Sequence, residues 1–377
     1  MSDTKKQKEN TISRRTFFSL LGVTPFAFNS LLAKDNFLKY NIQNFDFFKQ
    51  MQNINSTLNN PTNNPILNDT DLIIPPVLKE GDTVAFTAPA SPINIASIKT
   101  CIDFFSSKNC KIIIGDTISK NKNENRYFSA PDLVRANELN SLFANPEIKA
   151  IICGRGGYGV MRILPYLDYK IIRQNPKIVM GYSDITALLL AMQSKSKVVA
   201  FHGPVGASKI TDVHKINMTN ILFNSQNSNV KYYVPDMQAI TKGVARGKLQ
   251  GGNMTLISAT MGTDYEINLD NAILFIEDVS ILAHDFDRML TQLLISNKLA
   301  NCKGIIIGKM KNFEKRGDFY PNRAYTILEI TEQLIKPLGI PCVYDLPFGH
   351  VESSLIFPLG MEAELNIDQK TIEIFYS

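Results

Sequence analysis

The sequence predicts an α/β protein with a doubly wound, mostly parallel N-terminal sheet domain and a second, smaller, β-rich α/β domain. Two observations support this fold class. Short apolar runs alternate with helix-like stretches between about residues 83 and 202, and strand-like runs outnumber helices beyond about residue 240. A length of 377 residues suits two domains with additional segments. The composition, 44% hydrophobic and 20% charged, is ordinary for a globular protein.

Five short apolar runs predict the strands of the first sheet, because strands buried on both faces read as almost continuous apolar segments. These runs are 83–88, 111–115, 150–154, 177–181 and 198–202. Helices are expected at 95–106, 130–144 and 185–193, between the strands. The alternation defines an N-terminal domain over residues 76–210 that carries the candidate nucleophile.

The pattern changes after about residue 210. Residues 211–240 are rich in Lys, Asn and Thr, and we expect a linker there. Strand-like runs follow at 243–249, 272–276, 304–308, 341–346, 361–367 and 371–376, with helices at 253–261, 284–296 and 324–338. Residues 241–377 are therefore predicted to form the second, β-rich domain.

The N-terminus has the pattern of a twin-arginine export signal. Arg14 and Arg15 precede an apolar stretch, 17–33, which contains Pro25 and Asn29 and is poorly suited to span a membrane. Residues 1–33 thus predict export of a folded protein by the twin-arginine machinery, to the periplasm. A surface amphipathic helix is the alternative, and a poor cleavage site leaves retention as a membrane anchor open. Residues 34–75 are rich in Asn, Gln and Asp, which predicts a disordered spacer.

Charge and cysteine content argue against several classes of protein. The net charge of +5 is small, and lysines and acids are interspersed, so no nucleic-acid partner is expected. The five cysteines form no Cys-x-x-Cys pair and are interpreted as small buried hydrophobic residues, although the spacing of Cys101 and Cys110 permits a disulfide. No clustered set of His, Asp and Glu ligands appears, and we expect neither a metal nor a cofactor.

Ser183 stands where a predicted strand meets a predicted helix, in Gly181-Tyr182-Ser183-Asp184. A serine on such a turn exposes its hydroxyl at the edge of the sheet, next to helix N–H groups that favour negative charge. The pattern is half of a Gly-x-Ser-x-Gly elbow, because the fifth residue is Ile185. Taken alone, the residues favour a helix cap over a nucleophile.

A glycine-rich stretch, residues 154–159, follows the preceding predicted strand. It matches neither a dinucleotide-binding nor a phosphate-loop pattern. In a neighbouring βα loop, the N–H groups of Gly156 or Gly157 can form an oxyanion hole with that of Asp184. A tight structural turn is the alternative interpretation.

A nucleophilic serine also needs a base and an acid that orients it. Of the four histidines, His350 has the loop position typical of functional residues, and His202 is either a turn residue or a wall of the site. Glu277 is the first polar side chain at the end of an apolar run, which also fits a solvated strand terminus.

These elements occur in an order that resembles the LD-carboxypeptidase family, the muramoyltetrapeptide carboxypeptidases, which includes the microcin-immunity peptidases. The resemblance covers the chain from about Pro76 to its C-terminus. It rests on motifs at 81–92, 155–159, 164–168, 181–186, 202–204, 251–253, 276–278 and 349–350. One departure lies at 280–286, where relatives commonly carry a Glu-x-Pro-Tyr-like segment, whereas the following Asp287-Arg288 pair is kept.

The resemblance implies a Ser-Glu-His triad, which maps onto Ser183, Glu277 and His350 in a cleft between the domains. It implies cleavage of a murein tetrapeptide before its terminal D-Ala, and a homodimer. Independently of the resemblance, we expect Arg155 to reach the terminal carboxylate of the substrate, and Tyr182 and His202 to contact the substrate as well. Two alternatives remain: a microcin-immunity-type peptidase, which export disfavours, and a catalytically silent peptidoglycan-binding relative.

Overall fold

The computed structural model describes residues 71–120, 127–224, 228–311, 325–352 and 354–376. These residues belong to one compact unit, Thr70–Ser377. The expected export signal, 1–33, and nearly all of the expected spacer, 34–75, lie outside the described residues. Among the helices described, none is both long enough and apolar enough to cross a membrane.

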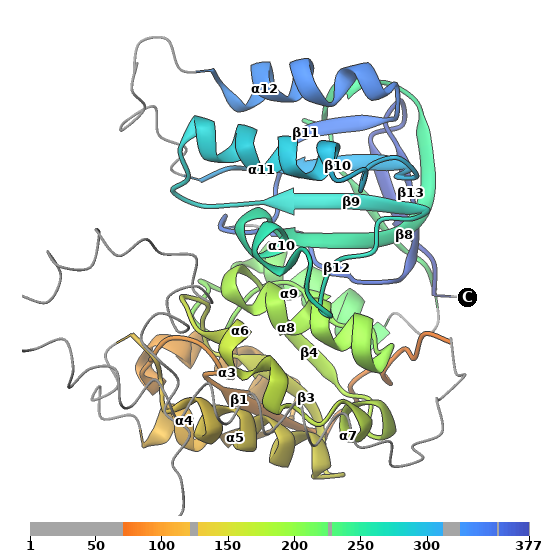
Figure 1. Cartoon of the computed structure of the whole chain (residues 1–377). Coiled ribbons are helices and arrows are strands. Elements are labelled where there is room, and N and C mark those ends of the chain that lie inside the picture. The colour runs from red at the N-terminus through yellow and green to blue at the C-terminus, as the bar shows by residue number, and fades with distance from the viewer. Residues whose placement is uncertain (1–70, 121–126, 225–227, 312–324, 353, 377) are drawn as a thin grey trace, which may run out of the picture. The chain divides into compact units, whose positions relative to one another are not determined.

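The first sheet has six strands in the order β12-β5-β4-β3-β1-β2, and all neighbours are parallel except β12 and β5 (Figure 1). Its strands are β1 (Thr83–Thr87), β2 (Lys111–Ile114), β3 (Ile148–Cys153), β4 (Ile178–Gly181), β5 (Phe201–His202) and β12 (Phe357–Pro358). Strands β1 and β4 are buried along their whole length, as their apolar runs predicted. The mostly parallel sheet is confirmed.

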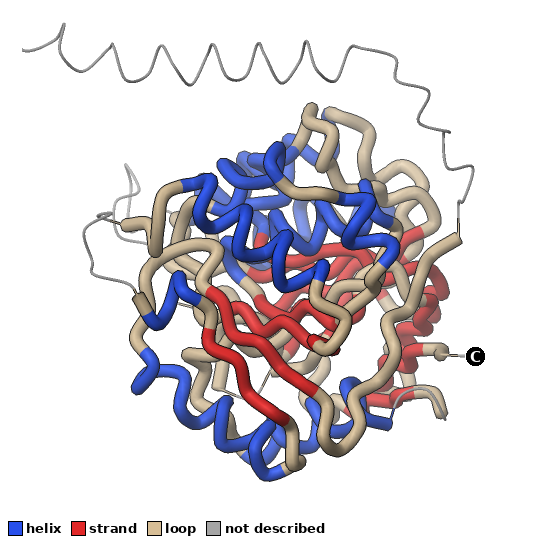
Figure 2. Tube along the Cα trace, turned by 90° about the horizontal axis from the view of Figure 1, so that it is seen from below, coloured by secondary structure: helices blue, strands red, loops and turns tan. Residues whose placement is uncertain are grey.

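Helices cover this sheet on both faces, and Figure 2 shows strands as an inner layer between helices. They are α3 (Lys99–Ser107), α4 (Asp116–Ser119), α5 (Asp132–Ala144), α6 (Val160–Ile163), α7 (Tyr169–Gln174) and α8 (Thr186–Ala191). Short 3-10 turns occur at Ile95–Ile98, Leu164–Tyr166 and Ser183–Ile185, and α8 continues into a π-helical turn at Met192–Ser196. Every residue of α8 is buried, which fits a helix that is apolar apart from Thr186.

The second sheet has eight strands in the order β6-β14-β13-β8-β9-β10-β11-β7. Its strands are β6 (Val230–Tyr233), β7 (Gln238–Thr241), β8 (Val244–Asn253), β9 (Ala272–Glu277), β10 (Gly304–Gly308), β11 (Cys342–Leu346), β13 (Glu362–Asn366) and β14 (Thr371–Ile374). The central strands β8 to β11 are parallel, and the outer pairs are antiparallel. The parallel strands are connected through α10 (Met254–Thr260), α11 (Ala283–Ile295) and α12 (Ile327–Leu334), the last followed by a 3-10 turn at Lys336–Leu338 (Figure 1).

The segment expected as a linker, 211–240, instead contains α9 (Asp212–Thr219), a π-helical turn (Asn220–Asn224) and the strands β6 and β7. Because the segment is mostly polar, the regular spacing of its few apolar residues is difficult to recognise in the sequence. Met218, Ile221 and Leu222 are buried one turn apart, and β6 alternates buried and exposed residues. The apolar positions are few but fall on one face, which is sufficient for an element packed on one side only.

Two further boundaries differ from expectation. Residues 71–75, expected at the end of the spacer, belong to the folded part, because Ile73 forms a parallel bridge with Val198. The N–H of Ile73 donates to Lys197 O (2.7 Å), and the N–H of Val199 donates to Ile73 O (2.9 Å). Strand β12, from the C-terminal half of the chain, pairs with β5, so the C-terminal half contributes one strand to the first sheet. All five cysteines are buried, as predicted.

Candidate active site

Ser183 lies immediately after β4, on a strained turn. Its φ is 64°, in the left-handed region that non-glycine residues rarely adopt at a cost of roughly 1–2 kcal/mol. A Cβ on Gly181 would lie 2.8 Å from Ile185 Cγ2, so the turn requires glycine there. The sharp strand-to-helix turn expected for a nucleophile is therefore present.

The glycine-rich loop lies directly against this serine. Strands β3 and β4 are parallel neighbours, so the loops that follow them meet at one edge of the sheet. A Cβ on Gly156 would lie 2.7 Å from Ser183 Cβ and 3.3 Å from the backbone N of Asp184. Gly157 has a φ of 111°, and a Cβ there would collide with Ser91. Of the two candidate glycines, Gly156 is the one that contacts the candidate nucleophile.

Polar side chains hold the loop in this position. Ser91 Oγ accepts a hydrogen bond from the Tyr158 N–H (3.1 Å), and Asp184 Oδ2 accepts one from the Val160 N–H (2.8 Å). Burial raises the pKa of Asp184 to about 6, although the Val160 N–H and the charge of Arg135 oppose the rise. Asp184 lies in the first helical turn after β4, where backbone N–H groups lack an intrahelical partner, so its N–H is available to a ligand.

The sequence did not reveal the role of Arg135, which is fully buried beneath the loop. Its guanidinium donates to the carbonyls of Gly159 (3.0 Å), Ala130 (3.0 Å) and Pro89, and pairs with Asp132. It therefore ties the end of the glycine loop to the loop after β1 and to the start of α5. Arginines on helices usually face solvent, so burial of Arg135 is not expected from the sequence. The one sequence feature that indicates it is Asp132, an acidic partner three residues earlier.

Glu277 and His350 form a hydrogen-bonded pair, with 2.7 Å between Glu277 Oε2 and His350 Nδ1. Glu277 ends β9 and His350 follows β11, and both strands run parallel to β10, so their carboxyl ends share one edge. Glu277 is completely buried, whereas the His350 side chain is 16% exposed. A Cβ on Gly349, whose φ is 83°, would collide with the Glu277 carboxylate. The glycine before His350 is thus required for this approach.

Two histidines keep Glu277 ionised. Burial alone would raise its pKa, but interactions with His202 and His350 outweigh burial and lower the pKa to about 2. Because an ionised carboxylate only accepts hydrogen bonds, the Nδ1 of His350 carries the proton and its Nε2 is left to act as a base. The pair therefore has the tautomer that a serine triad requires.

The neighbouring carboxylate, Asp278, serves the fold. Its oxygens accept hydrogen bonds from Asn253 Nδ2 (2.9 Å), the Thr255 N–H (2.8 Å), Thr255 Oγ1 (2.7 Å) and the Val279 N–H (2.8 Å). Burial raises its pKa. Asp278 fixes the start of α10 to the end of β9 and contacts neither imidazole. Within the Glu-Asp pair the structure thus selects Glu277 as the residue that orients a histidine.

The serine and the Glu-His pair come from different sheets, which contact each other at this edge. The Tyr182 ring lies edge-on to the His350 ring, with 4.7 Å between centroids. Thr186 Oγ1 accepts a hydrogen bond from the Asn253 N–H (3.0 Å), and a Cβ on Gly252 would lie 2.5 Å from Thr186 Cγ2. Within the described residues no hydrogen bond joins Ser183 to His350. In ligand-free enzymes such bonds are often long and tighten with substrate.

The three residues expected to contact the substrate have different environments. Tyr182 is half-buried beside His350. Arg155 is exposed and lines a cavity of about 400 Å³ with Asn94 and Ser97. His202 is completely buried next to Glu277 and has no exposed surface for a substrate to contact, so the expectation that it binds the substrate is wrong. Its position follows from β5, which places its ring inside the core.

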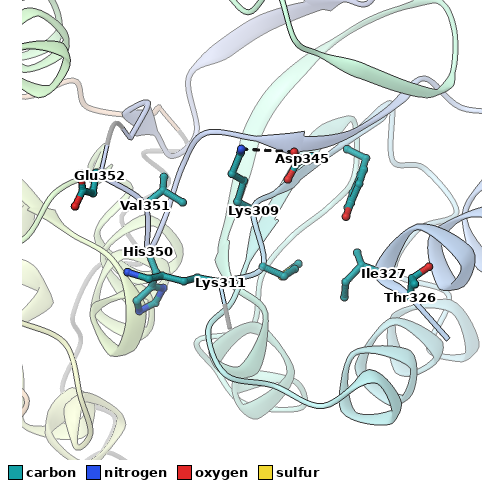
Figure 3. Close-up of a pocket in the computed structure, with 10 residues that line it drawn as sticks. Lys309, Lys311, Thr326, Ile327, Asp345, His350, Val351 and Glu352 are labelled. Carbon is teal, nitrogen blue, oxygen red and sulfur yellow. Dashed lines mark ion pairs between the residues drawn. The ribbon is translucent and has the colours of Figure 1, made fainter. Parts of the chain in front are cut away.

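A second cavity, of about 540 Å³, opens at His350 (Figure 3). It is lined by Lys309, Met310, Lys311, Thr326, Ile327, Tyr344, Asp345, His350, Val351 and Glu352. Lys309 pairs with Asp345 at 3.6 Å, and Figure 3 shows Lys311 extending in the direction of His350. Among the described residues, Lys311 forms no ion pair. A cavity with an unpaired cation beside a candidate base suits a negatively charged ligand.

Comparison with known proteins gives two family matches, one in each half of the chain. The chain matches the LD-carboxypeptidase N-terminal domain over residues 84–203 and the LD-carboxypeptidase C-terminal domain over residues 246–365. Ser183, Gly156 and Gly157 lie in the first match, and Glu277 and His350 lie in the second.

Two curated relatives have different names. The chain is 33% identical over 306 residues to the "Probable murein peptide carboxypeptidase" of Bacillus subtilis (strain 168), covering 80% of this chain and 93% of the relative. It is 27% identical over 331 residues to the Microcin C7 self-immunity protein MccF of Escherichia coli, covering 79% and 94%.

Solved structures similar to this chain also include both a carboxypeptidase and MccF. The muramoyltetrapeptide carboxypeptidase from Oxalobacter formigenes superimposes with a TM-score of 0.66 at 26% identity, covering 78% of this chain and 97% of that one. MccF in complex with aspartyl sulfamoyl adenosine gives a TM-score of 0.73 at 25% identity, covering 81% and 99%. The two-domain fold with a mostly parallel first sheet is shared with both.

Proposed function

Because the chain belongs to the LD-carboxypeptidase family, we propose that it is an exported serine LD-carboxypeptidase that removes the terminal D-Ala from murein tetrapeptides. One observation carries the proposal. The buried Glu277 carboxylate orients His350 at 2.7 Å, beside a serine turn that the glycine-rich loop covers. Peptidoglycan remodelling or recycling is the process that such a reaction serves.

In the proposed mechanism, Ser183 Oγ attacks the carbonyl carbon of the scissile peptide bond while His350 Nε2 takes its proton. Glu277 stabilises the imidazolium that forms. The N–H of Asp184 and that of Gly156 or Gly157 stabilise the oxyanion, each by roughly 3–4 kcal/mol. His350 then protonates the departing amine of D-Ala, and water, activated by the same histidine, hydrolyses the acyl-enzyme.

The cavity beside His350 supports a peptide substrate with a free carboxylate. Among the described residues that line it, Lys311 forms no ion pair, whereas Lys309 is partly neutralised by Asp345. A lysine ammonium binds a carboxylate through a charge-assisted hydrogen bond. We therefore assign the contact with the terminal carboxylate to Lys311 rather than to Arg155, which lines the other cavity.

The proposal includes the location of the enzyme. Arg14 and Arg15, ahead of an apolar stretch, support export by the twin-arginine machinery to the periplasm, where murein is found. A reporter fused after residue 75 tests this part, since export should fail when both arginines are replaced by lysine. The homodimer remains part of the proposal, and sedimentation of the purified enzyme tests it.

Digestion of purified muropeptides tests the activity. Tetrapeptide and pentapeptide are incubated side by side with the wild type and with Ser183→Ala, and the products are weighed by mass spectrometry. The proposal expects loss of one D-Ala from the tetrapeptide, abolished in the variant. Intact tetrapeptide after prolonged incubation with the wild type would contradict it, and binding without cleavage would identify a catalytically silent relative.

A second candidate is an MccF-like peptidase, favoured by the structural likeness to MccF and by the altered segment 280–286. Aspartyl sulfamoyl adenosine, the compound in that MccF complex, is the matching substrate for a test. Release of aspartate from this compound, faster than release of D-Ala from tetrapeptide, would favour the second candidate.

A further inference from the structure

His202 is a buried histidine that the Ser-Glu-His mechanism does not use. It lies on β5 with none of its surface exposed. Its ring packs against the rings of Phe275 (5.4 Å between centroids), Phe348 (6.1 Å) and Tyr182 (6.2 Å). Among the described residues, neither ring nitrogen has a hydrogen-bond partner. Buried polar atoms are rarely left in this condition, because an unmade hydrogen bond destabilises the folded state.

An equally isolated acceptor faces this ring. Glu277 Oε2 binds His350, but Oε1 is buried without a hydrogen-bond partner, 3.6 Å from His202 Nε2. This separation is a few tenths of an ångström too long for a hydrogen bond. His202 can donate a hydrogen bond and Glu277 Oε1 can accept one, and both atoms are shielded from water. Among the described residues, neither atom has another hydrogen-bond partner.

The backbone fixes His202 at this point. His202 pairs with Gly181 of β4 on one side and with Phe357 of β12 on the other. Its Cα is therefore held between the strand that precedes the candidate nucleophile and the strand contributed by the C-terminal half. A side chain anchored in this way can position a carboxylate from the second sheet relative to Ser183.

We propose that His202 is a positioning residue whose Nε2–H donates to Glu277 Oε1, so that the carboxylate is held between two imidazoles. Held at both oxygens, Glu277 cannot rotate away from His350. The hydrogen bond from His202 also takes up part of the negative charge of Glu277. The carboxylate therefore attracts the proton of His350 less strongly. The role in catalysis rests on the proposed serine mechanism, whereas the hydrogen bond itself does not.

The titratable groups around His202 define the expected pH dependence. They are Glu277 from β9, Tyr182 from the turn after β4 and, beyond Glu277, His350. Phe275 and Phe348 complete the surroundings and carry no charge. Loss of the His202 donor therefore leaves more of the carboxylate charge facing His350. Protonated His350 is favoured, and the acidic limb of the kcat/KM profile moves to higher pH.

Two variants separate positioning from packing. His202→Gln keeps a donor near the Nε2 position, whereas His202→Phe keeps the ring volume and removes the donor. Positioning predicts that kcat falls at least about tenfold more in His202→Phe than in His202→Gln, with KM nearly unchanged. It also predicts that the acidic limb moves upward in His202→Phe alone. A packing role predicts the reverse order of activity and an unmoved pH profile, which would overturn the proposal. Circular dichroism of both variants tests whether each of them folds.

A measurement without substrate distinguishes this inference from the proposed function. Imidazole N–H protons in strong buried hydrogen bonds exchange slowly and give downfield proton NMR signals. We expect one such signal that disappears in both His202 variants and shifts in Glu277→Gln, whether or not the enzyme cleaves murein peptides. Absence of such a signal, or its insensitivity to Glu277→Gln, would refute the hydrogen bond. Intact tetrapeptide with the signal present would refute only the murein activity.

Discussion

Replacement of Glu277 by glutamine tests how His350 is oriented and charged. The substitution keeps the size of the side chain but removes the negative charge that faces His350 Nδ1 at 2.7 Å. The imidazolium that forms when Ser183 attacks then loses its stabilising partner. The amide can also present its NH₂ to His350, which would stabilise the wrong tautomer and block the base.

The structure sets the size of the expected effect. Interactions with the two histidines lower the pKa of Glu277 from 4.5 to about 2, which corresponds to roughly 3 kcal/mol in favour of the charged form. Loss of that amount from the transition state slows the reaction on the order of 10²-fold. Selection of the wrong tautomer increases the loss to about 10⁴-fold. We therefore expect kcat to fall between about 10² and 10⁴-fold while KM changes little.

The assay is the rate of D-Ala release from tetrapeptide, with the reaction of Ser183 with a fluorophosphonate as a readout that does not depend on the peptide. Asp278→Asn is the matched control. Asp278 binds Asn253, Thr255 and Val279 and contacts no imidazole, so its loss should lower the melting temperature but leave kcat within about tenfold. Retention of more than a tenth of wild-type kcat in Glu277→Gln, or an equal loss in Asp278→Asn, would refute the reasoning.

Three further predictions follow from the same residues. Gly156→Ala should lower kcat about 10²–10³-fold in the peptide assay, because the added Cβ would lie 2.7 Å from Ser183 Cβ; full activity would exclude Gly156 from the site. Lys311→Gln should raise KM roughly tenfold with kcat preserved, whereas Lys309→Gln, which removes a lysine already paired with Asp345, should have a smaller effect on KM. Since the pKa of Glu277 is lowered on folding, its stabilisation is complete above about pH 4.5 and is lost as the pH falls toward 2. Urea unfolding across this range should therefore show the wild type losing about 3 kcal/mol relative to Glu277→Gln.

Apolar runs predicted the strands of both sheets where burial was complete on both faces. Strands β1, β3, β4, β9 and β10 lie within a few residues of their expected positions. The same reasoning missed β6, β7 and β12, which are short or only half-buried and depend on partners distant in sequence. Where a strand has few apolar residues, its position is determined mainly by the neighbouring strand with which it forms hydrogen bonds.

The sequence also carried most of the candidate site, because its residues follow local patterns. Ser183 stands in a strand-to-helix turn, and the glycine-rich loop follows the preceding strand of the same sheet. The sequence could not show the role of Arg135, because its burial depends on carbonyl groups from loops distant in sequence. The assignment of His202 to the substrate was wrong for a similar reason, since a histidine after an apolar run has the same pattern whether its ring faces solvent or core.

The sequence by itself determined the doubly wound class, the turn that carries Ser183 and the identity of Glu277 and His350 as candidates. These depend on apolar periodicity and on residue types at the ends of strands, which are local properties of a chain. Only the tertiary structure decided that Glu277 rather than Asp278 faces His350, that Gly156 lies against Ser183 and that His202 lies at the second oxygen of Glu277. The first two contacts join the ends of strands within one sheet, and the third joins the two sheets. Their geometry is fixed by packing and burial rather than by any spacing along the chain.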